Sequence, residues 1–241
     1  MGATLAAIDV AILAGGLGTR LAGAVPGLPK VLAPVAGRPF VEHLLDWLER
    51  HGARHVVFLL GHRADQVEAH LTAHPRPALD IAYSVESAPL GTGGALGHAR
   101  THLASDPVLV VNGDTFVDAD LAALAAAHAR ARVPATMLCV TVPDAGRYGR
   151  VEIADGRVRA FREKDPAFAG AAAINAGVYL VSQALLATIP GGAPLSLERE
   201  VFEKLPSGTL GAWLDPAARF VDIGTPASWA GAGAVVEGGG T

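Results

Sequence analysis

The chain has little cysteine, little net charge and no basic leader, and each shortage excludes a class of protein. Cys139 is the only cysteine among 241 residues and lies in an apolar, strand-like run, so we expect a buried, unreactive thiol and a reducing cytoplasm. The formal net charge of -4 includes no long basic block, which argues against nucleic acid as the main partner. The N-terminal residues run directly into a strand without a basic segment, so we expect neither a signal peptide nor a membrane partner.

Two common phosphate-binding motifs are also absent. The glycines Gly15, Gly16 and Gly18 are followed by Thr19 and Arg20, whereas a P-loop would continue with Lys and then Ser or Thr. A dinucleotide-binding loop would need a further glycine where this chain has leucine. It would also need an acidic residue about twenty positions on, where this chain has arginine. The loop therefore belongs to neither of these classes.

The same glycines nevertheless stand where a phosphate site is expected. Residues 8–14 are short and apolar, which suits a buried parallel strand that ends at the glycines. Open α/β sheets bind ligands at the carboxyl ends of their strands, where glycine lets backbone N–H groups approach phosphate oxygens. Arg20 and Lys30 then supply positive charge. The chain has three lysines against sixteen arginines, which favours a role for Lys30 that needs a compact point charge.

Alternating strand and helix signals predict an α/β fold. Apolar runs that suit buried strands recur between helix-like segments, at residues 8–14, 56–60, 81–85, 107–111 and 135–142. The pattern then changes, because residues 148–153 and 157–161 alternate around Asp155-Gly156, a strong signal for a two-residue hairpin. We expect one domain over residues 1–236, with a nucleotide-binding half to about 145 and a second half from about 146. Residues 237–241 are expected to form a frayed tail.

Polar residues stand at the predicted ends of two further strands. The glycine-rich segment 86–96 opens a helix and can either present free N–H groups to an anion or base, or allow tight packing. Asp114 follows an apolar strand beside glycine, a position that suits a hard cation. Asp118 is expected to cap the next helix, which leaves Asp114 free for this work.

The second half contributes further polar candidates. Asn175 opens a strand, and its amide can pair with a ligand hydroxyl or bridge backbone groups. Thr225 and Pro226 are expected to cap and start a terminal helix, so Asp222 is not needed for that role.

Together these segments resemble the sugar-1-phosphate nucleotidylyltransferase family. The matching segments are GGLGTRL with a lysine before Pro-Val, PLGTGGAL, NGDTF, RYGRVE, FREK, INAGVYL and VDIGTP. Ala22-Gly23-Ala24-Val25 replaces the Pro and Thr that many family members carry, which leaves the path of that loop open. The resemblance implies a Rossmann-like three-layer α/β sandwich with a mixed, mainly parallel sheet.

The resemblance also assigns roles to individual residues. The implied catalytic residues are Arg20, Lys30, Asp114 and Lys164. The implied nucleotide-binding residues are Leu13, Gly15, Gly16, Gly18, Thr19, Glu86, Gly91, Thr92, Asn112 and Gly113. The implied sugar-phosphate-binding residues are Tyr148, Gly149, Glu163, Lys164 and Asn175. Asp114 and Asp222 are implied to converge on one Mg²⁺ ion, and Glu86 is a candidate for reading a purine.

The implied reaction joins a sugar 1-phosphate to the α-phosphorus of an NTP and releases pyrophosphate. The resemblance favours GTP as donor and a manno-configured heptose 1-phosphate as acceptor. Mannose 1-phosphate with GTP and N-acetylmuramate 1-phosphate with UTP remain alternatives, as does a catalytically idle sugar-nucleotide sensor. A glycosyltransferase is disfavoured, because Asn112-Gly113-Asp114 lacks the first carboxylate of a D-x-D motif. No hexapeptide repeats indicate a fused acyltransferase, and a monomer or homodimer is expected.

Overall fold

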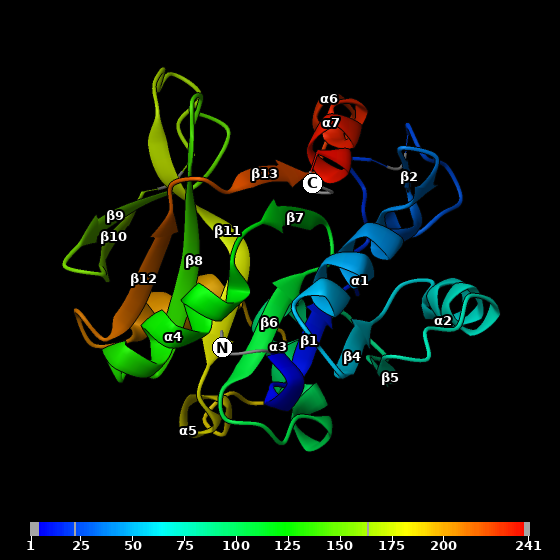
Figure 1. Ribbon diagram of the computed structural model, residues 1–241, viewed down its shortest axis with the longest axis horizontal. Helices are drawn as coiled ribbons and strands as arrows, with labels where there is room; N and C mark the ends of the chain where they lie inside the picture. Colours follow the sequence, from blue (N-terminus) through cyan, green and yellow to red (C-terminus); the bar gives the residue numbers. More distant parts are fainter. Residues whose placement is uncertain (1–4, 22, 163, 239–241) are drawn as a thin grey trace.

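The computed structural model describes residues 5–21, 23–162 and 164–238. Its central element is a nine-stranded mixed sheet with the order β5-β4-β1-β6-β11-β8-β12-β10-β9 (Figure 1). The strands of this sheet are β1 (Val10–Leu13), β4 (His55–Leu60), β5 (Asp80–Val85), β6 (Val108–Asn112), β8 (Ala135–Val142), β9 (Arg150–Ala154), β10 (Arg157–Arg162), β11 (Ala172–Val181) and β12 (Leu210–Asp215). Strands β5, β4, β1 and β6 run parallel, whereas β11 runs antiparallel to its neighbours β6 and β8.

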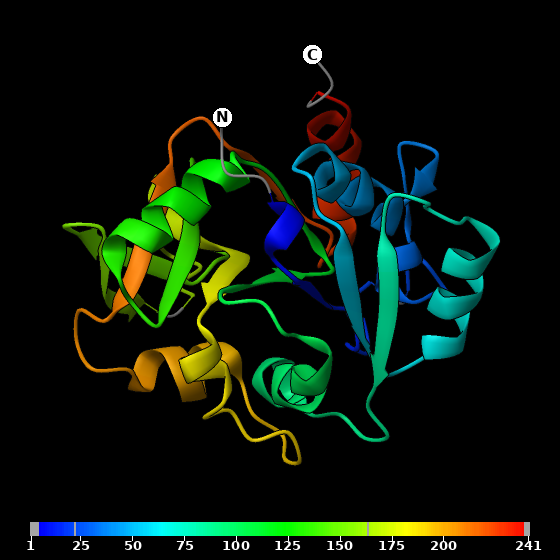
Figure 2. The same cartoon turned by 60° about the horizontal axis from the view of Figure 1, so that its bottom comes forward.

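Helices cover both faces of this sheet (Figure 2). They are α1 (Phe40–Arg50), α2 (Ala64–Ala73), α3 (Gly91–His98), α4 (Leu121–Ala131), α5 (Gln183–Leu186), α6 (Pro226–Ala230) and α7 (Ala232–Glu237). Alternate residues of β1 enter two separate cores, because successive side chains of a strand point to opposite faces. Val10 and Ile12 pack with α1, α2, α4 and α7, whereas Ala11 packs with α3 and α5. The expected three-layer α/β sandwich is confirmed.

Several local expectations are also met. Residues 135–142 form β8, and the hairpin turns at Asp155 and Gly156, whose φ angles of 53° and 66° fit a two-residue turn of the type expected. Ser182 and Thr225 cap α5 and α6, and Pro226 is the first residue of α6. Among the helices of the described residues, none combines the length and apolar character needed to cross a membrane.

The expectation that Asp118 caps a helix is wrong. Residues 115–118 form a short strand, β7 (Thr115–Asp118), which pairs with β13 (Arg219–Asp222), and Asp118 forms an ion pair with Arg219. Asp120 caps α4 instead, because its carboxylate accepts hydrogen bonds from the N–H groups of Ala122 and Ala123. The pairing with a distant strand thus extends β7 to the position where the local pattern placed the cap.

The other ends of elements lie close to their expected places. Pro39 stands at the N-cap of α1 and also belongs to a two-residue strand, β3 (Arg38–Pro39), paired with β2 (Pro34–Val35). Helix α7 extends to Glu237, one residue into the segment expected to be frayed. Residues 239–241 lie outside the described residues.

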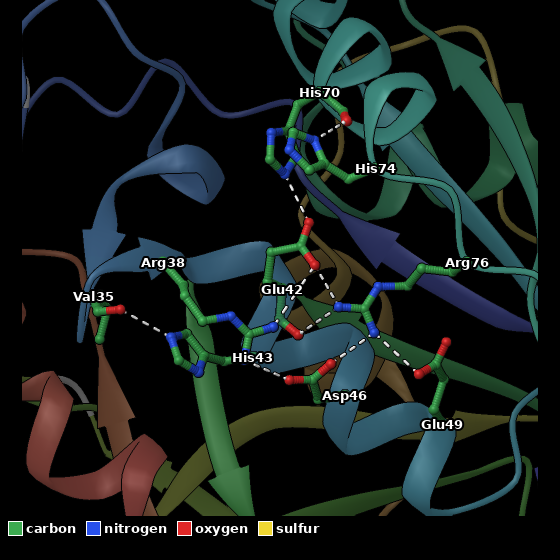
Figure 3. Close-up of polar contacts among 9 residues, drawn as sticks. All are labelled: Val35, Arg38, Glu42, His43, Asp46, Glu49, His70, His74 and Arg76. Carbon is green, nitrogen blue, oxygen red and sulfur yellow. Dashed lines mark hydrogen bonds and ion pairs between the residues drawn. The ribbon is translucent and has the colours of Figure 1, made fainter.

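An ion-pair network fastens the segment after α2 to α1 (Figure 3). The guanidinium of Arg76 contacts the carboxylates of Glu42, Asp46 and Glu49, all three on α1. His70 of α2 adds a hydrogen bond of 2.7 Å from its Nε2 to Glu42. Burial by itself would raise the pKa of Glu42, but the hydrogen bonds from Arg76 and His70 outweigh it and lower that pKa.

Candidate active site

A cavity of about 430 Å³ opens where β1 and β6 end and α3 begins. We call it the nucleotide cavity. All ten residues expected to bind nucleotide line it: Leu13, Gly15, Gly16, Gly18, Thr19, Glu86, Gly91, Thr92, Asn112 and Gly113. Three of the four expected catalytic residues, Arg20, Lys30 and Asp114, line it as well. The structure thus gathers into one cavity residues that are up to 101 positions apart in the sequence.

Two of the glycines that line the nucleotide cavity could not carry a side chain without strain. Gly18 has a φ of +62°, a conformation that L side chains rarely adopt. Gly113 donates its N–H to the carbonyl of Leu13 at 2.9 Å, and a Cβ at this position would lie 2.8 Å from the same oxygen. The end of β1 and the turn after β6 therefore pack backbone against backbone at this point.

The glycine-rich start of α3 has a more specific role than the sequence indicated. The hydroxyl of Thr92 accepts a hydrogen bond from the N–H of Leu197 at 2.8 Å and donates to Glu198 at 3.0 Å. The N–H groups of Gly93 and Gly94 are both directed at the carbonyl of Leu195. Tight packing against residues 195–198 and exposure to the cavity therefore coexist here, whereas the sequence left them as alternatives.

Glu86 lines the nucleotide cavity next to the start of α3. One carboxylate oxygen accepts a hydrogen bond from the N–H of Leu90 at 3.0 Å, which closes the turn that leads into α3. The other oxygen packs so closely over Gly15 and Gly61 that a Cβ on either would lie within 3.0 Å of it. Glu86 is thus held rigidly at the position from which it was expected to read a base.

The two aspartates expected to hold Mg²⁺ lie on neighbouring backbones. Asp222 ends β13, and the next residue, Ile223, donates its N–H to the carbonyl of Asp114 at 2.9 Å. The Lys30 ammonium contacts the Asp114 carboxylate at 2.5 Å, and the Asp114 side chain is 37% exposed. Mg²⁺ commonly takes one or two carboxylates together with substrate phosphates and water. Asp114 lines the nucleotide cavity and Asp222, 19% exposed, lies on the adjoining backbone; the two carboxylates fit that ligand set, although no group of three potential ligands occurs within the described residues.

Tyr148 and Arg147 contact Asp222 from the other side. The Tyr148 hydroxyl donates to Asp222 at 2.8 Å, and Arg147 lies 3.3 Å from the same oxygen. Burial and the adjacent Asp222 carboxylate raise the pKa of Tyr148 far above its ordinary value, so the hydroxyl keeps its proton. Tyr148 therefore acts as a hydrogen-bond donor that orients Asp222.

A second cavity, of about 800 Å³, lies beside the hairpin and residues 196–210. We call it the acceptor cavity. Tyr148, Gly149, Lys164 and Asn175 line it, as expected for the sugar-phosphate site. Glu163, the fifth residue expected there, lies outside the described residues. Asp222 lines neither cavity but contacts Tyr148 of the acceptor cavity and lies two residues from Gly224 of the nucleotide cavity.

The acceptor cavity contains charged residues that the sequence reasoning missed. Besides the expected Lys164, four further cations line it: Arg150, Arg159, Arg162 and Arg199. Arg150 stands within the RYGRVE segment, so that motif was available as a signal. Glu198 lies in a π-helical turn (Leu197–Val201) that carried no motif, and its bond to Thr92 spans 106 positions. Such a contact leaves no local pattern in the sequence.

Comparisons with known proteins agree with this geometry. A model of the nucleotidyl transferase family matches residues 10–233. D-glycero-alpha-D-manno-heptose 1-phosphate guanylyltransferase of Aneurinibacillus thermoaerophilus is 33% identical over 221 residues, covering 91% of this chain and 94% of that protein. Mannose-1-phosphate guanylyltransferase of Mycobacterium tuberculosis is 36% identical over 225 residues, covering 91% of this chain but 62% of that longer protein. The structure of HddC from Yersinia pseudotuberculosis complexed with GMP-PN has a TM-score of 0.85 and 30% identity, covering 94% of this chain and 98% of that one.

The chain therefore belongs to the nucleotidyl transferase family. This membership confirms the family and the enzyme class expected from the sequence, a sugar-1-phosphate nucleotidylyltransferase. Other solved structures, among them an inositol-1-phosphate CTP transferase from T. maritima at 15% identity and a TM-score of 0.78, share the fold.

Proposed function

We propose that this enzyme transfers GMP from GTP to D-glycero-α-D-manno-heptose 1-phosphate and releases pyrophosphate. The observation that carries the proposal is the pair of adjoining cavities, one lined by glycines and the other by cations. Glu198 of the acceptor cavity bonds to Thr92 of the nucleotide cavity, and Tyr148 of the acceptor cavity bonds to Asp222, which lies two residues from Gly224 of the nucleotide cavity. Two anionic substrates can therefore be held end to end, which suits transfer of a nucleotidyl group.

The heptose acceptor rests on the relatives. The heptose 1-phosphate guanylyltransferase of Aneurinibacillus thermoaerophilus matches this chain over 94% of its own length. Mannose 1-phosphate is the second candidate, since the mycobacterial mannose enzyme is 36% identical, although the chain spans only 62% of that protein. GTP as donor is supported by both relatives and by the GMP-PN complex of HddC.

The chemistry needs positioning more than proton transfer. An oxygen of the acceptor phosphate attacks the α-phosphorus of GTP, the bond from that phosphorus to the β-phosphate bridging oxygen breaks, and pyrophosphate leaves. The attacking phosphate is already an anion, so no general base is required, and the enzyme mainly offsets repulsion between two anions. In this proposal Lys164 holds the acceptor phosphate, Lys30 holds oxygens at the α-phosphorus, and Arg20 stabilises the leaving pyrophosphate.

Asp114 and Asp222 are the residues that would hold Mg²⁺. When bound, the ion would neutralise phosphate charge as the leaving group departs. Lys30 balances Asp114 through the 2.5 Å contact, and the Tyr148 hydroxyl fixes the orientation of Asp222. The Lys30 and Tyr148 contacts thus hold both carboxylates in position before substrates arrive.

The test is pyrophosphate release with Mg²⁺, crossing GTP, ATP, UTP, CTP and dTTP with heptose, mannose, glucose and N-acetylmuramate 1-phosphates. We expect the highest kcat/KM for GTP with the heptose phosphate. A higher value with mannose or N-acetylmuramate 1-phosphate would replace the acceptor named here and leave the reaction class intact. Silence in every combination, with GTP still bound, would instead identify a sugar-nucleotide sensor.

A further inference from the structure

A continuous series of hydrogen bonds between side chains connects the two cavities through Glu198. Thr92, in the nucleotide cavity, donates its hydroxyl to Glu198 Oε2 at 3.0 Å. Tyr179 donates its hydroxyl to Glu198 Oε1 at 3.0 Å and accepts a hydrogen bond of 2.7 Å from Asn175 Nδ2. Asn175 and Glu198 both line the acceptor cavity, whereas the Tyr179 side chain is fully buried behind them. The bonds therefore run from one wall of the site to the other without a break.

An irregularity in the backbone of β11 places Asn175 and Tyr179 so that their side chains can form this hydrogen bond. The register of β11 against β8 shifts between Asn175 and Tyr179, which marks a bulge. Gly177 lies within the bulge with a φ of +72° and donates its N–H to Asn175 Oδ1 at 2.9 Å. Bulges re-aim side chains beside active sites, and this one brings the Asn175 amide onto the Tyr179 hydroxyl.

Glu198 retains capacity to accept one more hydrogen bond. A carboxylate offers about four acceptor positions. The described residues occupy three of them, since Ser196 also donates to Glu198 Oε2 at 3.0 Å. The remaining position is on Oε1, which belongs to a side chain that lines the acceptor cavity.

Among the described residues that line the acceptor cavity, Glu198 and Glu203 are the two carboxylates, and Glu198 is held by hydrogen bonds from three neighbouring side chains. Arginine and lysine side chains bind phosphate but have no lone pair with which to accept a hydrogen bond from a sugar hydroxyl. The five cations of this cavity therefore cannot satisfy the donor hydrogens of a sugar ring. A carboxylate that is already fixed by three neighbours accepts such a bond with little loss of side-chain entropy.

We propose that Glu198 binds a hydroxyl group of the acceptor sugar and thereby helps to select the acceptor. This inference rests on the proposed function, because it takes the acceptor cavity to be the sugar-phosphate site. Tyr179, itself held by Asn175, fixes one carboxylate oxygen, and Thr92 and Ser196 fix the other. In this proposal Glu198 binds the sugar and also connects the acceptor cavity to Thr92 of the nucleotide cavity.

The test compares E198Q with E200Q, a control on the same turn. Glu200 lies outside both cavities and accepts only the N–H of Ser196 among the described residues, a bond that glutamine can also accept. We expect E198Q to raise the KM for the heptose phosphate about tenfold or more, the factor for losing a hydrogen bond to a charged group. The KM for GTP should change little, since the Gln oxygen can still accept from Thr92, and E200Q should match the wild type.

Two further measurements separate binding from a general loss of structure. Monodeoxy analogues of mannose 1-phosphate identify the hydroxyl: one analogue should be penalised in the wild type, and this penalty should disappear in E198Q. Calorimetric titration of the heptose phosphate, without nucleotide, measures the same effect without turnover.

The outcomes distinguish the inference from the function on which it rests. Wild-type protein that binds the heptose phosphate more tightly than E198Q supports the inference even if no pyrophosphate is released, and only the proposed reaction then fails. Equal acceptor affinity in wild type and E198Q, or an unchanged deoxy penalty, overturns the inference even if the wild type turns over GTP. A parallel loss in E200Q would also overturn it, because that result would assign the effect to the turn and not to Glu198.

Discussion

Removal of the Arg76 guanidinium is expected to destabilise the α1–α2 layer far more than removal of any exposed arginine. The Arg76 and Glu42 side chains are each 12% exposed, and Asp46 and Glu49 are 31% and 29% exposed (Figure 3). In Arg76→Met these three carboxylates lose their shared partner while staying largely covered. Breaking a fully buried ion pair costs about 3–5 kcal/mol. The partial exposure of Asp46 and Glu49 reduces this to about 3 kcal/mol in the free energy of unfolding.

Arg38→Met provides the matched control. Arg38 forms ion pairs with the same carboxylates, Asp46 at 2.9 Å and Glu42 at 3.9 Å, but its side chain is 47% exposed. Exposed ion pairs contribute about 0–1 kcal/mol, so this variant should stay close to the wild type. For a chain of this size, 3 kcal/mol corresponds to a fall in Tm of roughly 6–12 °C for Arg76→Met. Thermal and urea unfolding at pH 7 measure both variants.

The pH dependence of the difference tests its electrostatic origin. Burial would raise the pKa values of Glu42 and Asp46, but Arg76 and the other hydrogen-bonding partners lower both below their usual 4.5 and 3.8. Carboxylates with lowered pKa values stabilise the fold above their usual pKa and lose that contribution as the pH falls through the lowered value. The gap between wild type and Arg76→Met should therefore be complete at pH 7 and shrink below about pH 4. Equal losses in Arg76→Met and Arg38→Met, or a gap independent of pH, would refute this reasoning.

Three further predictions concern the site and the core. Asp222→Asn should raise the Mg²⁺ concentration for half-maximal rate at least about tenfold, as loss of even an outer partner of a metal does; an unchanged Mg²⁺ titration would remove Asp222 from the metal site. Gly177→Ala should cost about 1–3 kcal/mol, because φ is +72° and the new Cβ would lie 2.6 Å from Asn112 Nδ2. Gly192→Ala, with nothing within 4 Å, should be nearly neutral in the same unfolding assay. Burial raises the pKa of Cys139 to about 12, so a thiol reagent at pH 8 should label the unfolded but not the folded protein; rapid labelling of folded protein would contradict the buried position.

Features that depend on neighbouring residues were predictable from the sequence. The strand over residues 135–142, the Asp155-Gly156 hairpin and the caps at Ser182 and Thr225 follow from local propensity and turn chemistry. The residues expected to bind nucleotide were brought together because strands of a parallel sheet end at one edge, so polar residues after separate strands meet there.

Features that depend on distant pairing were not predictable. Asp118 was misplaced as a cap because β13, about a hundred residues later, extends β7 over it. The hydrogen bond between Glu198 and Thr92 and the ion pair between Arg76 and Glu42 of α1 likewise join distant segments. The local sequences around Glu198 and Arg76 are typical of an exposed surface and carry no motif. The local sequence does not show which of many charged residues will meet, because these side-chain pairs form only once the order of the strands in the sheet is fixed.

The central claim is that the two cavities hold the donor and acceptor of one nucleotidyl transfer. The most direct test uses GTP labelled with radioactive phosphorus, at the α position in one reaction and at the γ position in another, with Mg²⁺ and the heptose phosphate. We predict that the α label enters a sugar nucleotide and the γ label leaves in pyrophosphate. Transfer of the γ label to the sugar, or no redistribution of either label while GTP remains bound, would contradict it.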